Sequence, residues 1–301
     1  MVVVPNLYGI RRFFSKHGTG MLFLAPAVAL NLIFFIQPLI RVIQMSFYNW
    51  RVIGTNTFLG LGNYERLIND PLFWKALSNT VIYTLIVTPG IFLLALALAL
   101  LLNRKLPGTN VYRTIYFVPV AISFVVSSLV WLWIFNELYG ILNYGLSSLG
   151  LISSRISWLG STWMARISVS VMVIWKTAGF SMMILLAGLQ GVPVQVYEAA
   201  DIDGANTRQR FLFVTMPMIR PTFILALMIS LIGSFLAFDH FHVMTQGGPA
   251  NGTLTIVMYI FRTGFEYFNL GYGSAMSIVL LVILIILSVI QTRFLDSDNV
   301  E

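Results

Sequence analysis

Two side chains that could carry chemistry lie inside otherwise apolar stretches of the sequence. Lys176 lies in the middle of the apolar segment 164–189. Asp239 lies near the end of a second apolar segment, 221–243. A charge within a membrane span costs about 2.5–3.5 kcal/mol on insertion scales, so Lys176 should face a cavity, another subunit or a carboxylate such as Asp239. A structural salt bridge explains Lys176 at least as well as contact with a ligand does.

The sequence lacks the reactive groups that most enzymes need. No Gly-Lys dipeptide occurs, so no P-loop can form, and no cysteine could act as nucleophile or metal ligand. No Ser-His-Asp set, pair of carboxylates or zinc-ligand spacing stands out. His240 and His242 are two residues apart and point to different faces of a helix, so a place at the membrane boundary explains them better than a metal. We predict no catalytic residue, metal site or cofactor in this chain.

The composition places these residues in a membrane protein. Hydrophobic residues make up 58% of the 301 residues and charged residues 10%, with a mean hydropathy of +0.85. Soluble domains carry about 25% charged residues, so this chain could not cover a water-facing surface of its size. Helices satisfy their own backbone polar groups in lipid, which predicts an all-α bundle. The net charge of +7 orients spans and meets anionic lipid, so no nucleic-acid partner is expected.

Six segments hold the roughly 20 apolar residues that a membrane-spanning helix needs. They cover residues 21–47, 77–103, 112–136, 164–189, 221–243 and 270–294. No signal-peptide cleavage site follows the first segment, so it is interpreted as a retained span. Pro26 and Pro38 should kink the first span, and Pro89 with Gly90 should interrupt the second.

The basic residues indicate how the chain is oriented. If the N-terminus is cytoplasmic, 10 of the 18 Lys and Arg residues lie in cytoplasmic segments, 7 lie on the opposite side and Lys176 lies within a span. This excess has the sign of the positive-inside rule, so both termini should be cytoplasmic. We expect a single transmembrane domain over residues 1–301, with a cytoplasmic tail at 1–20 and a cytoplasmic loop at 190–220.

The cytoplasmic loop has the pattern of a short helix followed by a second one. Pro193 suits the first turn of a helix, and Glu198 and Asp201 should then lie near its positive N-terminal end. Gly204 permits a chain reversal, after which a second helix can begin near Asn206. The loop is either a solvated helix-turn-helix or a rigid handle on which a partner acts, and the spacing alone favours neither.

The motif in this loop resembles that of a known family. Glu198-Ala199-Ala200, followed by Gly204 and Pro217, is similar to the EAA loop of permease subunits of binding-protein-dependent ABC importers. In that family the loop forms a coupling helix that docks into a groove on the ATP-hydrolysing subunit. The resemblance implies a type I ABC importer permease fold. It also implies that coupling depends on Glu198, Ala199, Ala200, Asp203 and Gly204.

Other segments resemble the carbohydrate-uptake branch of this family. Residues 58–64 are similar to its first outer loop and residues 140–143 to its second. Thr245-Gln246-Gly247-Gly248-Pro249 resembles its third outer loop, which favours a sugar or oligosaccharide over an amino acid or a metal. The resemblance implies that Gly247, Gly248 and Pro249 face an extracytoplasmic binding protein.

The resemblance also implies a set of partners in a bacterial inner membrane. They are a second permease subunit, as a heterodimer by family habit, two ATPase subunits that bind ATP and Mg²⁺, and a solute-binding protein. Within the family, glycerol-3-phosphate or another polyol-like solute is an alternative, in which Lys176 meets the phosphate. A stand-alone secondary transporter would show inverted repeats and more buried charge, and an enzyme would need clustered reactive groups; the sequence shows none of these.

The solute path should combine aromatic faces with polar groups, as sugar sites do. The candidates are Trp131, Trp133, Asn136, Trp175, Lys176, Phe238 and Asp239. For each tryptophan, packing or anchoring at the membrane interface is the commoner role. In some family members only one of the two permeases contacts the solute, so this chain could be the silent one.

Overall fold

The structure is a computed structural model that describes residues 20, 22–51, 54–104 and 107–296. Apart from residue 20, the expected cytoplasmic tail 1–20 lies outside the described residues. Within them, five helical segments are long and apolar enough to cross a membrane. These segments are Leu22–Ser46, Pro71–Leu102 (α4), Thr162–Gln190 (α8), Thr207–Met244 and Leu270–Arg293, the last within α14 (Leu270–Asp296).

The expected single span at 112–136 is wrong, because two helices bent by 98° replace it. Helix α5 (Thr109–Ala121) ends at Ile122, which is extended, and α6 (Phe124–Ile134) starts at once. Ser123 caps α6, since its hydroxyl accepts a hydrogen bond from the amide of Val126 at 3.2 Å. With the bent pair counted as one span, the described chain has six, as expected.

Pro89 does not interrupt the second span, contrary to expectation. Helix α4 runs through Pro89 without interruption. Gly90 instead lets α8 approach closely, because a Cβ there would displace the side chain of Ile174. In the first span, the π-helical segment η1 (Leu32–Ile36) precedes α2 (Gln37–Ser46), which carries Pro38 in its first turn.

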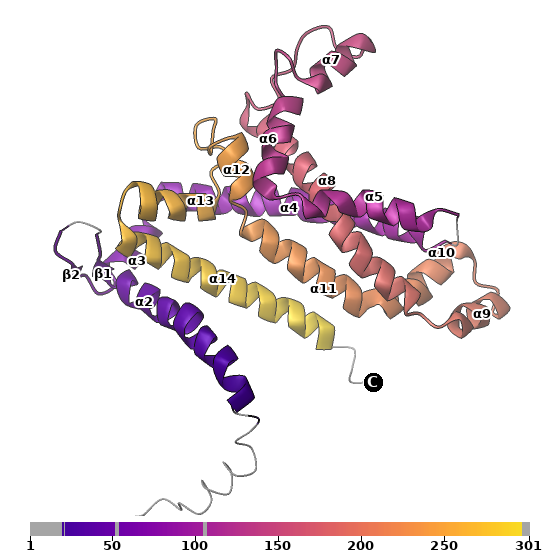
Figure 1. The fold of residues 1–301 in the computed structure, drawn as a ribbon, viewed down its shortest axis with the longest axis horizontal. Coiled ribbons are helices and arrows are strands. Elements are labelled where there is room, and N and C mark those ends of the chain that lie inside the picture. Colours follow the sequence, from indigo (N-terminus) through magenta and orange to yellow (C-terminus); the bar gives the residue numbers. More distant parts are fainter. Residues whose placement is uncertain (1–19, 21, 52–53, 105–106, 297–301) are drawn as a thin grey trace, which may run out of the picture.

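The core lies where α4, α8 and α11 (Met216–Phe235) pack together (Figure 1). Ala95 and Ala99 on α4 are fully buried beside Met182 and Leu185 on α8. Small residues let the helices approach: a Cβ on Gly179 would overlap the backbone carbonyl of Tyr116 on α5. Close backbone packing therefore holds α8 between its neighbours.

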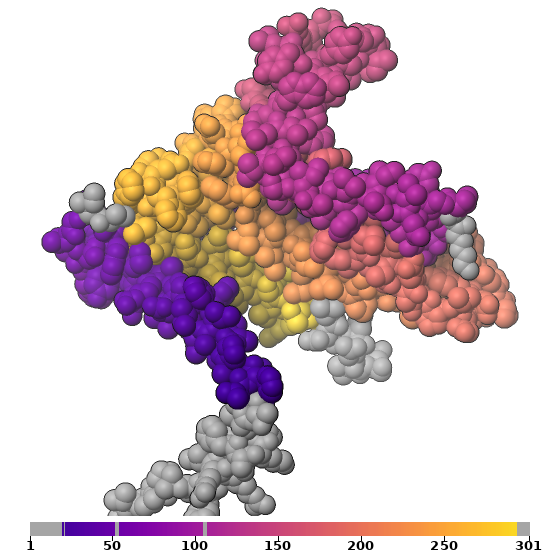
Figure 2. All heavy atoms as spheres, viewed as in Figure 1, coloured from indigo at the N-terminus to yellow at the C-terminus, as the bar shows by residue number. Residues whose placement is uncertain are grey.

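The remaining elements lie around this core. They are β1 (Tyr48–Asn49), β2 (Thr57–Phe58), α3 (Gly62–Ile68), α7 (Ile141–Ser148), α9 (Val194–Ile202), α10 (Thr207–Arg210), η2 (Phe211–Thr215), α12 (Asp239–Met244), α13 (Ile256–Phe261) and η3 (Arg262–Glu266). Strands β1 and β2 pair antiparallel. Helices α6 and α7 project from the body as an arm, and the first span lies beside α14 at one edge (Figures 1 and 2).

Candidate functional site

The motif helix α9 is short and presents most of its motif to solvent. Pro193 is its N-cap, one position before the first turn in which we expected it. Glu198 and Ala199 are exposed, whereas Ala200 is buried against the loop. Glu198 lies in the middle of the helix and Asp201 in its last turn, so the expectation that both lie near the positive end is wrong.

Gly204 adopts the backbone conformation that the sequence predicted. Its φ is +78°, in the left-handed region, and Asp203 before it is the exposed C-cap of α9. A Cβ at Gly204 would have open space around it, so the constraint is on the backbone and not on packing. Another residue in this region costs roughly 1–2 kcal/mol.

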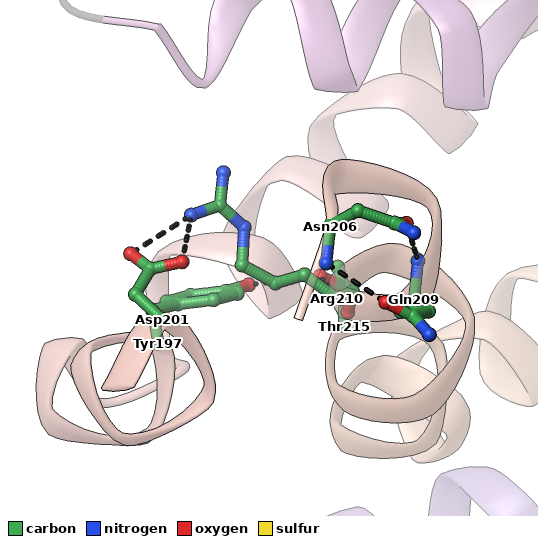
Figure 3. A network of polar contacts seen from close by, with 6 residues as sticks. All are labelled: Tyr197, Asp201, Asn206, Gln209, Arg210 and Thr215. Carbon is green, nitrogen blue, oxygen red and sulfur yellow. Dashed lines mark hydrogen bonds and ion pairs between the residues drawn. The ribbon is translucent and has the colours of Figure 1, made fainter. Parts of the chain in front are cut away.

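The chain beyond Gly204 is tied back to α9 (Figure 3). Arg210 donates to both carboxylate oxygens of Asp201, at 2.9 and 3.1 Å. The hydroxyls of Tyr197 and Thr215 lie 3.3 Å apart. Asn206 begins the second helix as expected and forms a reciprocal capping box with Gln209.

Arg210 and Tyr197 were not among the candidates, because neither belongs to the motif. A basic residue nine positions after Asp201 is the one signal in the sequence that could have suggested the pair.

A hollow that is partly open to the surface lies between α4, α5, α6, α8, α11 and α12. Its volume is about 260 Å³. The walls are mostly apolar, and the polar side chains that line it are Tyr83, Lys176, Thr177, Ser181, Ser230, Ser234 and His240. This cavity adjoins the break between α5 and α6, because Val120 and Phe124 also line it.

Lys176 is buried at this break and binds backbone oxygens. Its ammonium donates to the carbonyls of Pro119 (3.2 Å), Val120 (3.4 Å) and Ile122, and lies 4.6 Å from the centre of the Phe124 ring. An ammonium has three hydrogens, so these three acceptors use its whole donor capacity. It also lies at the C-terminal end of α5, where a positive charge is favoured.

The carboxylate Asp239 does not pair with Lys176, so that alternative is wrong. Asp239 is exposed at the start of α12, and none of the described residues forms an ion pair with it. The expected boundary role of His240 is also wrong. His240 is buried, with its Nε2 2.9 Å from the hydroxyl of Tyr83, and both line the cavity. The half-buried His242 stacks on Phe238 instead.

The aromatic candidates fall into separate places. Trp131 and Trp175 are in contact, with ring centres 5.7 Å apart, and Trp175 is next to Lys176 in sequence. Trp133 lines a different hollow on the arm, together with residues of α7. Asn136 accepts hydrogen bonds from two amides in the turn after α6, a local structural role. Phe238 packs against Phe261.

The loop between α12 and α13, which we expect to be the third outer loop, is compact and largely buried. Gly247 has a φ of +72°, and the peptide bond between Gly248 and Pro249 is cis. Thr253 donates to the carbonyl of Gly248 at 2.6 Å. Gln246 and Ala250 are the exposed positions around this motif.

A carboxylate holds the N-terminal end of α4 in place near this loop. Asp70 caps α4 through the amides of Leu72 and Phe73 and accepts hydrogen bonds from the hydroxyls of Tyr259 and Tyr272, each at 2.6 Å. Burial by itself would raise the pKa of Asp70, but these four donors stabilise the carboxylate and hold the pKa below its usual value. For Tyr259, burial and the bond to Asp70 raise the pKa.

These features define a polytopic helical membrane protein with an exposed motif helix and a mostly apolar cavity that several polar side chains line. A profile of the family described as binding-protein-dependent transport system inner membrane component matches residues 91–297, and the chain belongs to this family. It is thus an inner-membrane transporter component, and the expected helical fold of a type I ABC importer permease is confirmed.

Individual relatives match the chain almost from end to end. It is 36% identical over 286 residues to the lactose transport system permease protein LacF of Rhizobium radiobacter, covering 94% of this chain and 95% of that protein. It is 37% identical over 293 residues to the arabinooligosaccharides transport system permease protein AraP of Bacillus subtilis strain 168, covering 96% and 92%. A bacterial ABC transporter involved in the import of the acidic polysaccharide alginate aligns with a TM-score of 0.81 at 25% identity, covering 94% of this chain and 98% of that one.

Proposed function

We propose that this chain is the permease subunit of an ATP-driven importer for a sugar or oligosaccharide. The observation that carries the proposal is the path from the exposed Glu198 face of α9 to the internal cavity. After the Gly204 turn, α10, η2 and α11 run on without a gap, and Ser230 and Ser234 of α11 line the cavity. A force on α9 can therefore reach the cavity wall along one helical segment.

The nature of the solute is supported by relatives whose names specify lactose and arabinooligosaccharides. The walls of the cavity supply hydroxyl and aromatic groups, as sugar sites do. Lys176 has no hydrogen-bond donor left for a phosphate, so the structure does not favour the glycerol-3-phosphate alternative. Among the aromatic candidates, Trp175 directly precedes the cavity-lining Lys176 in sequence, and its ring contacts that of Trp131.

The proposal includes separate partners. Two ATPase subunits bind ATP and Mg²⁺ and engage α9 from the cytoplasm, with both termini of this chain on that side. A solute-binding protein docks outside on the loop with Gly247, Gly248 and Pro249, and a second permease completes the pathway. Mild solubilisation of the tagged chain followed by mass spectrometry should recover an ATPase and a second permease in constant ratio. Recovery of the chain alone, together with transport in vesicles without ATP, would instead establish a secondary transporter.

The test of coupling is Glu198→Ala in the assembled complex. The exposed carboxylate is available to pair with a basic group of the ATPase, so its loss should lower uptake and solute-stimulated ATP hydrolysis together. Gln195→Ala is the matched control, because Gln195 is a polar, exposed residue of the same helix outside the motif. Wild-type coupling in the Glu198 variant would show that the carboxylate serves only its own helix.

A further inference from the structure

The third outer loop holds an unusual number of strained residues. Three residues other than glycine have left-handed backbone angles: Gln246 (φ 46°), Ala250 (φ 50°) and Asn251 (φ 57°). Residues in such sparsely populated regions persist only where their surroundings determine them, and they cluster at functional sites. The contacts that determine this loop therefore indicate what its shape is for.

Two buried side chains from distant helices hold the loop through its carbonyls. Arg166 of α8 donates from Nε (3.2 Å) and Nη2 (3.0 Å) to the carbonyl of Gly252, and from Nη2 to Oδ1 of Asn79 at 2.6 Å. Asn79 of α4 donates to the carbonyls of Asn251 and Leu254, both at 3.0 Å. The two side chains thus form one network under the loop, which we call the loop cradle.

The cradle is built around a buried charge with no other role in view. Arg166 is 7% exposed, and no carboxylate among the described residues pairs with it. Its guanidinium lies 4.8 Å from the ring centre of Trp163. The loop packs tightly over it, since a Cβ on Gly252 would collide with Thr162. Burying an unpaired arginine is unfavourable unless its donors are used, and here they fix loop carbonyls.

We propose that Arg166 and Asn79 are positioning residues that preform the loop surface at residues 246–250 for docking of the solute-binding protein. The inference rests on the proposed function, because it specifies how the outer partner is received. A preformed loop loses little conformational freedom on docking, so the cradle strengthens binding without touching the partner. Loosening the cradle should weaken docking and leave the catalytic cycle of the docked complex intact.

The experiment uses the complete transporter in nanodiscs and measures ATP hydrolysis against the concentration of solute-loaded binding protein. Arg166→Lys keeps the charge but loses the planar fork, and Asn79→Ser removes the amide. Both should raise the half-saturating concentration by about tenfold while the maximal rate stays near wild type. Arg41→Met is the control, since Arg41 is an exposed arginine that contacts Gln44 on its own helix.

A second readout separates loop geometry from docking. Amide hydrogen exchange at residues 246–254, measured without binding protein, should be faster in both cradle variants than in the wild type. Unchanged exchange would overturn the positioning role. Faster exchange with an unchanged half-saturating concentration would overturn docking on this loop but leave the importer function standing. A wild-type complex that responds to no binding protein would overturn the proposed function itself.

Lys75→Met keeps the test open if the buried variants do not assemble. Lys75 is exposed and donates to the carbonyl of Ala250 at 2.8 Å, from outside the cradle. Its loss should raise the half-saturating concentration by less than the cradle variants do, in an intact complex. An unchanged half-saturating concentration in Lys75→Met would count against the proposal.

Discussion

Lys176→Met tests how the broken third span is held. The substitution keeps the length of the side chain but removes the three donors that serve the carbonyls of Pro119, Val120 and Ile122. A buried carbonyl without a partner costs about 1–3 kcal/mol. Removing the charge returns about 2.5–3.5 kcal/mol of burial cost. The carbonyl of Pro119 keeps the amide of Ile122 as a donor at 3.3 Å, so two carbonyls lose their partner, at about 2–6 kcal/mol together. At the middle of both ranges the net loss is about 1 kcal/mol.

The assay is thermal unfolding of the purified assembled transporter, followed by fluorescence. At about 2–4 °C for each kcal/mol, the expected fall in melting temperature is roughly 2–4 °C. Lys176→Arg retains charge and donors and should recover much of the loss. Thr177→Val is the matched control, because Thr177 lines the same cavity but donates only to Val173 of its own helix. A wild-type melting temperature for Lys176→Met, or an equal fall for Thr177→Val, would refute the reasoning.

Lys176→Met also tests whether Lys176 contacts the solute. Uptake by Lys176→Met, measured in cells with labelled sugar, separates apparent affinity from maximal rate. An apparent affinity equal to wild type, with a lower level of assembled complex, fits a side chain whose donors all serve the backbone. A selective loss of affinity in complexes that melt normally would place the ammonium against the solute.

Three further predictions concern other parts of the chain. Gly204→Val should cost roughly 1–2 kcal/mol of backbone strain and uncouple ATP hydrolysis from uptake, whereas Gly204→Asn should retain part of the coupling, because asparagine tolerates the left-handed region. Because the pKa of folded Asp70 is lowered, its stabilising contribution is present above the unfolded pKa of about 4 and is lost as pH falls through the folded pKa. As the pH is lowered through that acidic range, the melting temperature should therefore fall less steeply for Asp70→Asn than for wild type. Gly179→Val should reduce the yield of folded protein on gel filtration, since the added carbons overlap the backbone of Tyr116, and Gly233→Val, at an exposed helical position with open space around it, is its control.

The positions of the spans could be predicted because hydropathy depends on composition alone. The direction of a helix does not enter that sum, so the 98° bend was hidden inside one continuous apolar run. Pro119 lies within α5 and does not mark the break, which falls at Ile122 and Ser123. Ser123 reads as one more small residue in the sequence, and its role as a cap appears only when the backbone turns there.

Residues of the candidate sites could be predicted where their constraint is local and could not be predicted where it comes from a distant part of the chain. Gly204 could be predicted because its constraint is local, a chain reversal directly after a helix. Arg166 could not, because its partner Gly252 lies 86 positions away in the sequence. The aromatic candidates were chosen by type without knowledge of which helix face each one occupies. Trp133 and Asn136 consequently lie apart from the cavity that Lys176 lines.

Motion from α9 to the cavity must pass through a few contacts whose strengths can be compared. The ion pair between Asp201 and Arg210 is exposed and contributes about 0–1 kcal/mol, too little to transmit force alone. The stiffer connections are the capping box of α10, the Tyr197–Thr215 contact and the covalent helix from η2 through α11. Segment η2 is π-helical, and such segments are frequent at functional sites. Displacement of α9 is therefore expected to turn on η2 and to move the wall that Ser230 and Ser234 form, with Gly204 fixing the direction in which the force is applied.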